Sequence, residues 1–145
     1  MDSNVLEPTL LVKKFINIIP KEVCQHLGSK ANLENTYWKL TVLYGKAVLH
    51  TQSTRREAHM VLSSGKVRGN GSCNGFGGVY ILDAYKLSFS DKGFVMTRMF
   101  CENSPEREFL KALRNMDSYK IQGEYLEIFD KNDSKLARFE SVYLY

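Results

Sequence analysis

Three cysteines and three histidines are the residues of this chain best suited to chemistry. They are Cys24, Cys73 and Cys101, and His26, His50 and His59. As a nucleophile, Cys73 would need a neighbouring base, and the sequence alone places no histidine beside it. There is no CxxC pair, and the cysteine spacings are too long for a zinc knuckle. Two alternatives stay open: three buried thiols, or one disulfide with one cysteine left over, which would require an oxidising compartment.

A metal site is the next chemical possibility, and the residue pattern argues against it. Glu57 and His59 share one face of a predicted strand, but no third ligand is evident. Methionines near cysteines can bind copper(I). Here they are dispersed at core-like positions: Met60, Met96, Met99 and Met116. We therefore expect packing rather than ligation, and predict no metal, no cofactor and no catalytic residue.

The stretch 69–78 is rich in glycine and could be taken for a phosphate-binding loop. However, it lacks GxxxxGK[ST], and no helical pattern follows it to supply backbone donors. The preferred interpretation is a tight, bulged crossing between strands. The glycines would permit positive φ or close backbone approach, and Asn74 would bond local backbone in an Asx-type turn.

Short segments with β-branched and aromatic residues dominate the chain and predict strands. Roughly nine lie after residue 35, over 37–44, 57–62, 66–69, 79–82, 85–90, 94–99, 119–121, 126–128 and 136–143. Another apolar run covers 9–19, and 47–50 could pair back after a turn at Gly45.

One helix is predicted between the strands. Ser104 can cap it, Pro105 suits its first position, and Phe109, Leu113 and Met116 form one apolar stripe. The helix should end near 115–117. The pattern predicts an α+β domain: a mostly antiparallel curved sheet or partial barrel with one main helix packed against it.

Size and charge bound the function. The 145 residues suit one domain, and the net charge of +4 is too small and scattered to predict a nucleic-acid partner. The sequence has no apolar run of about 18 residues that would cross a membrane. The N-terminus does not read as a signal peptide, so we expect either a cytosolic protein or a piece of a longer precursor.

The order of motifs resembles the META domain family. Its opening strand is similar to 36–40, its glycine–cysteine–asparagine motif to 69–80, its T-x-M-x-C motif to 97–101, its helix to 108–113 and a later strand to 125–130. Two departures stand out: Ser72 lies where the family often has Gly, and Phe100 where it often has Ala.

The resemblance implies an HslJ-like META domain over 35–145 and an N-terminal extension, strand plus connector, over 1–34. The whole chain is also similar to the C-terminal half of NlpE-like copper-resistance lipoproteins. For the site, the resemblance implies that Cys73 and Cys101 approach each other and can form a disulfide. The motif's structural residues would be Gly71, Asn74, Gly78 and Tyr80.

The function that the resemblance implies is a non-enzymatic module of the bacterial envelope, linked to stress response or metal and antibiotic tolerance. We expect a monomer in the periplasm or anchored at the outer membrane through a lipid upstream of this chain, with another envelope protein or domain as partner. Two alternatives remain: a copper-binding protein using cysteines, His59 and methionines, and a small enzyme built on Cys73.

Overall fold

The computed structural model describes residues 31–49 and 56–143. From Asn32 onward they belong to one compact unit, Asn32–Tyr145. The strand predicted over 9–19 and the first cysteine, Cys24, lie outside the described residues. Of the predicted extension 1–34, only 31–34 is described, and Leu33 is buried in the core.

Strands make up most of the described chain, and one helix follows the strand Lys86–Met96. The strands are β2 Tyr37–Leu43, β3 Lys46–Ala47, β4 His59–Ser63, β5 Lys66–Asn70, β6 Gly75–Asp83, β7 Lys86–Met96, β8 Ser118–Gln122, β9 Tyr125–Phe129 and β10 Lys135–Val142; the helix is α2 Glu106–Asn115.

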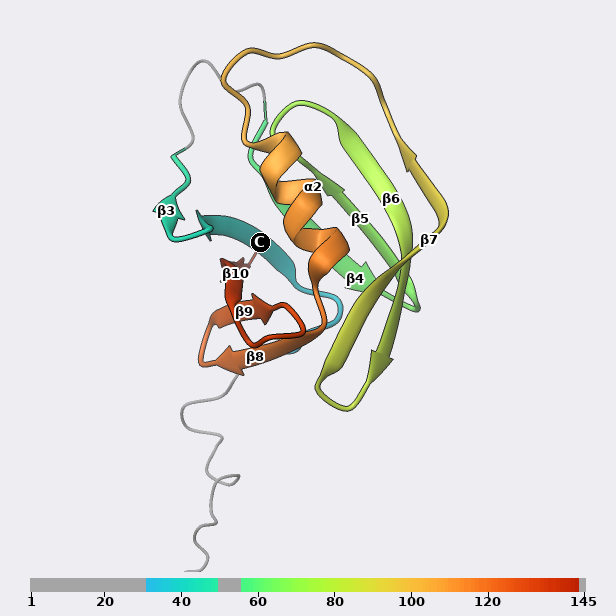
Figure 1. Cartoon of the computed structure of the whole chain (residues 1–145), viewed down its shortest axis with the longest axis vertical. Coiled ribbons are helices and arrows are strands. Elements are labelled where there is room, and N and C mark those ends of the chain that lie inside the picture. The colour runs from blue at the N-terminus through green and yellow to red at the C-terminus, as the bar shows by residue number, and fades with distance from the viewer. Residues whose placement is uncertain (1–30, 50–55, 144–145) are drawn as a thin grey trace, which may run out of the picture. The chain divides into compact units, whose positions relative to one another are not determined.

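Among the described residues the strands form one sheet in the order β10-β9-β8-β7-β6-β5-β4-β2-β3, and every pairing is antiparallel. The sheet closes on itself because β10 also pairs with β2. The weakest junction is between β7 and β8, which share a single registered pair, Lys86 with Ser118. Helix α2 packs against strands β7, β10 and β2 of this sheet (Figure 1). The predicted fold class, α+β with a curved antiparallel sheet and one helix, is confirmed.

Side-chain alternation explains which face of each strand lies inside. In β2, Trp38 and Leu40 are buried while Tyr37 and Lys39 are half-exposed. Trp38 is fully buried, and its indole Nε1–H donates a hydrogen bond to the carbonyl of Leu33, 2.9 Å away. The buried tryptophan therefore has its polar atom satisfied, as a core aromatic of this kind requires.

Strand β7 differs from the sequence prediction. The two strands expected over 85–90 and 94–99 are one strand, Lys86–Met96, paired with β6. Val79 pairs with Ser90 and Gly77 with Val95, so residues 91–94 face the single residue Gly78. The turn-forming sequence at 91–93 thus makes a wide bulge inside a continuous strand, because β6 holds both ends in one ladder.

Helix α2 begins close to its predicted start. The Ser104 hydroxyl accepts a hydrogen bond from the N–H of Glu106 at 3.2 Å, and the Pro105 carbonyl accepts the first helical bond, from Phe109. The predicted cap is wrong by one position: Pro105, not Ser104, is the N-cap and has no side-chain cap hydrogen bond, and the helix begins at Glu106. In the described part of the chain, no helix has the length and apolar character needed to cross a membrane.

Candidate functional site

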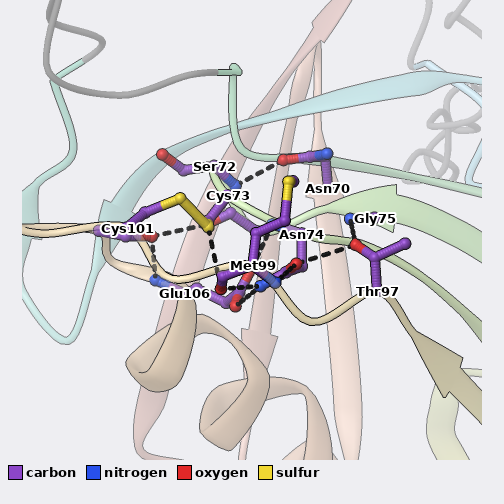
Figure 2. The surroundings of a disulfide bond; sticks show 11 residues. Asn70, Ser72, Cys73, Asn74, Gly75, Thr97, Met99, Cys101 and Glu106 are labelled. Atoms are coloured by element: carbon purple, nitrogen blue, oxygen red, sulfur yellow. Dashed lines mark hydrogen bonds between the residues drawn. A yellow bond between two sulfur atoms is a disulfide. The ribbon is translucent and has the colours of Figure 1, made fainter.

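The structure joins Cys73 and Cys101, which are 28 positions apart in sequence, in a disulfide with Cα atoms 5.9 Å apart. Cys73 follows β5 in a tight turn, and Cys101 follows the end of β7. Figure 2 shows the bond above the first turn of α2. The Cα separation is typical of disulfides. The two motif cysteines therefore lie together, although they come from separate connections of the sheet.

Asn74 is the centre of the polar network beside this disulfide (Figure 2). Its Oδ1 accepts hydrogen bonds from Thr97 Oγ1 at 2.9 Å and from the N–H of Met99 at 2.7 Å. Its Nδ2 donates to the Met99 carbonyl at 3.1 Å and to Glu106 Oε2 at 2.8 Å. The carboxamide thus uses all four of its hydrogen-bonding positions, and Asn74 is 3% exposed. This saturated side chain fastens the segment after β7 to the start of α2.

The expectation that Asn74 forms a local Asx-type turn is wrong. Asn70 forms it instead, because its Oδ1 accepts the N–H of Ser72, two residues on, at 2.8 Å. Asn74 reaches residues more than twenty positions away, which sequence spacing could not reveal.

Glu106 completes the network and was not predicted as part of the site. Its Oε1 accepts the backbone N–H of Asn74 at 2.6 Å while Oε2 accepts the side-chain N–H. Its place in the sequence shows only an acidic residue in the first turn of the helix. The signal that could have revealed it is a carboxylate at the N-terminal turn of the helix that follows the second cysteine closely.

Of the glycines in 69–78, Gly69 and Gly71 serve close approach, whereas a Cβ on the others would meet neighbours only at ordinary contact distances. None of them lies in the left-handed region, which Ser72 occupies instead with φ of 87°. A Cβ on Gly71 would come within 2.7 Å of Glu106 atoms, and one on Gly69 within 2.3 Å of the His59 carbonyl. The prediction of close backbone approach is therefore confirmed at these two positions, because neighbouring groups fill the space that a side chain would need. The prediction of positive φ is wrong.

The other two motif residues lie further along β6. Gly78 faces Phe94 of the β7 bulge, and a Cβ on Gly78 would lie 3.5 Å from the Phe94 ring. The hydroxyl of Tyr80 donates a hydrogen bond to Glu34, and burial, with this carboxylate as the next cause, raises the pKa of Tyr80. Both residues shape the sheet, whereas Gly71 and Asn74 surround the disulfide.

A surface cavity of about 380 Å³ opens beside the disulfide. Among the described residues, its lining includes Cys73, Cys101, Phe100 and Arg107 and no histidine. Phe100 is 87% exposed, whereas Cys73 is 2% exposed. The Met99 carbonyl lies 3.5 Å from Cys73 Sγ, a close contact only, since a disulfide sulfur has no proton to donate.

The other residues considered for chemistry lie elsewhere. His59 stacks on Tyr37 with ring centroids 4.3 Å apart, and its Nδ1 is 2.9 Å from the Glu57 carbonyl. The Glu57 carboxylate accepts from the Tyr37 hydroxyl and pairs with Lys39 at 3.6 Å. Burial, followed by this carboxylate, raises the pKa of Tyr37. Glu57 and His59 thus have partners within the sheet.

The residues of the copper alternative are not brought together. Met60 and Met116 are buried, as predicted for core residues, whereas the prediction is wrong for Met99, which is 43% exposed. Within 31–49 and 56–143, no group of three or more His, Cys, Asp or Glu is placed to hold a metal ion. His26, His50 and Cys24 lie outside these ranges.

Fold and site together define a small disulfide-bonded β domain whose motif residues fasten a loop and a helix to the sheet. The META domain model matches residues 31–143, and the chain belongs to the META domain family. Two solved structures share the fold. An NMR structure of a protein from Burkholderia xenovorans is 24% identical, with a TM-score of 0.61, covering 77% of this chain and 85% of its own. A second NMR structure is 22% identical, with a TM-score of 0.57, covering 74% and 91%. No curated protein matches the chain.

Proposed function

We propose that this chain is a non-enzymatic interaction module of the bacterial cell envelope. Within the META family we place it with the HslJ-like domains and with the META-bearing part of NlpE-like lipoproteins, where stress response is the expected setting. Its partner would be another envelope protein or domain, reached by a monomer held through a lipid anchor upstream. The observation that carries this proposal is the Cys73–Cys101 disulfide, because such bonds persist in oxidising compartments.

The chemistry of the motif residues supports a non-enzymatic role. To act as a nucleophile or as a copper(I) ligand, Cys73 or Cys101 would have to be a thiolate, and the two sulfurs are bonded to each other. The Asn74 amide is likewise engaged on all sides, by Thr97, Met99 and Glu106. These residues therefore act through the structure that they hold, and no specific observation favours the copper or the cysteine-enzyme alternative.

Phe100 supports the interaction role. Asn74 is hydrogen-bonded to the backbone of Met99, which precedes Phe100, and the disulfide holds Cys101, which follows Phe100. The backbone at Phe100 is therefore fixed on both sides. The side chain is nevertheless 87% exposed. A large apolar side chain presented on a fixed backbone loses little conformational freedom on binding, which is how aromatic anchors contribute to interfaces.

Thiol counting tests the proposal directly. The protein is produced with an export signal, unfolded without reductant and titrated for free thiols, and the same protein retained in the cytosol serves as control. We expect one free thiol of the three in the exported protein. Three free thiols after export would contradict the proposal. So would rapid alkylation of Cys73 by iodoacetamide at neutral pH, because that would reveal a reactive thiolate.

A further inference from the structure

Ser72 combines two unfavourable features. Its φ of 87° lies in the region that favours glycine. Its hydroxyl is buried and has no hydrogen-bond partner among the described residues, and the residue is 2% exposed. The backbone of Ser72 is satisfied, because its N–H donates to Asn70 and its carbonyl accepts the N–H of Arg56 at 3.2 Å. The hydroxyl is therefore a buried polar side-chain group that still needs a partner.

Ser72 also lines a small cavity. Its volume is about 20 Å³, and it lies where β2, the segment before β4, the β5–β6 connection and the start of α2 meet. The polar lining comes from Lys39, Arg56, Glu57 and Ser72, and Pro105 lines it from the helix. A water molecule needs roughly 10–15 Å³ of such volume and two to four polar partners. The space is thus large enough for one water.

We infer that one ordered water molecule binds the Ser72 hydroxyl in this cavity and bridges the β5–β6 connection to the segment at Arg56–Glu57. Water suits the site better than a halide ion, because the Glu57 carboxylate lines the cavity with the two cations and pairs with Lys39. Water can donate to one group and accept from another, whereas a halide only accepts.

As the residue that binds this water, Ser72 has a role separate from that of Cys73. The residue precedes Cys73, and its hydroxyl takes no part in the hydrogen-bond network beside the disulfide. A glycine would suit the backbone better but would leave this junction without the hydroxyl.

Crystal structures of the full chain and of Ser72→Ala, grown in bromide, test the inference. We expect a water within hydrogen-bond distance of Ser72 Oγ in the wild type, without anomalous signal, and its loss or displacement in the variant. Because the alanine keeps the unfavourable φ and loses the bridge, the Tm of Ser72→Ala should fall by roughly 2–5 °C. Ser63→Ala, which removes an exposed hydroxyl, is the matched control with a Tm close to wild type.

Each opposing result would overturn the inference. These are a cavity without water density in the wild type, a water that keeps its place in Ser72→Ala, and an anomalous bromide peak. A Tm of Ser72→Ala above the wild type would also overturn it, because deleting a hydroxyl without a partner should stabilise the protein.

Discussion

Asn74 and Glu106, 32 positions apart, are joined by two hydrogen bonds, from the backbone N–H over 2.6 Å and from the side-chain amide over 2.8 Å. The pair links the turn after β5 to the first turn of α2. The disulfide links the same turn to the loop that precedes α2. Two chemically different ties therefore hold one junction, and they can be separated by mutation.

Asn74→Ala should lower the free energy of unfolding by about 2–4 kcal/mol, because it leaves buried partners on Met99 and Glu106 without hydrogen bonds. Urea unfolding measures the change. Asn132→Ala, in an exposed turn, is the control and should cost much less. A loss for Asn74→Ala no greater than the control's would mean that the network adds little to stability.

Gly71→Ala should destabilise the protein by about 1–3 kcal/mol. A Cβ there would lie 2.7 Å from Glu106 side-chain atoms that Asn74 holds in place, so one of the two hydrogen bonds must break. Gly77→Ala is the matched control. Its Cβ would meet neighbours at 3.6 Å or more, and we expect a change within about 1 kcal/mol. Equal effects in urea unfolding would refute the steric explanation.

Replacing both Cys73 and Cys101 by alanine should cost about 3–4 kcal/mol, the loop-closure contribution for a separation of 28 residues. Dithiothreitol should lower the Tm of the wild type toward that of the double variant and leave the variant unchanged. If the reductant moved the two proteins equally, its effect would not come from this bond.

Phe100→Ser should change the free energy of unfolding by no more than about 0.5 kcal/mol, since the ring is already in water. Phe109→Ala removes a fully buried ring and should cost about 3–5 kcal/mol. Thermal unfolding of both variants makes the comparison. A large loss for Phe100→Ser would show that the ring serves folding, against the role proposed for it.

The lowered pKa of Glu124 predicts part of the loss of protein stability at acid pH. Hydrogen bonds from Ser141 first, and then from Tyr143, lower the pKa of Glu124 below its ordinary 4.5. The folded state therefore favours the carboxylate. This stabilisation is present above pH 4.5 and is lost as the pH falls below that value and through the lower folded pKa.

Glu124→Gln should flatten the Tm profile between pH 3 and pH 6 relative to the wild type, while Glu140→Gln on β10 serves as control. An unchanged acid limb in Glu124→Gln would mean that the loss of stability comes from other groups.

The pattern of residue types determined most of the elements by itself. Alternating residue types predicted the strand that is β2, and the sequence from Ser104 to Met116 predicted α2, although its N-cap is Pro105 rather than Ser104. These signals are local, because strand alternation and helix capping depend on residues within a few positions of each other. The motif order was also sufficient to resemble the META family, to which the chain belongs.

Tertiary structure alone decided the relationships across the chain. It made one bulged strand of the two expected in 85–99, because β6 supplied a partner to both halves. It gave the Asx turn to Asn70 and turned Asn74 toward Glu106, and it brought Cys73 to Cys101. Such contacts depend on which segments the closed sheet sets side by side, and single-sequence spacing does not encode that distance in space.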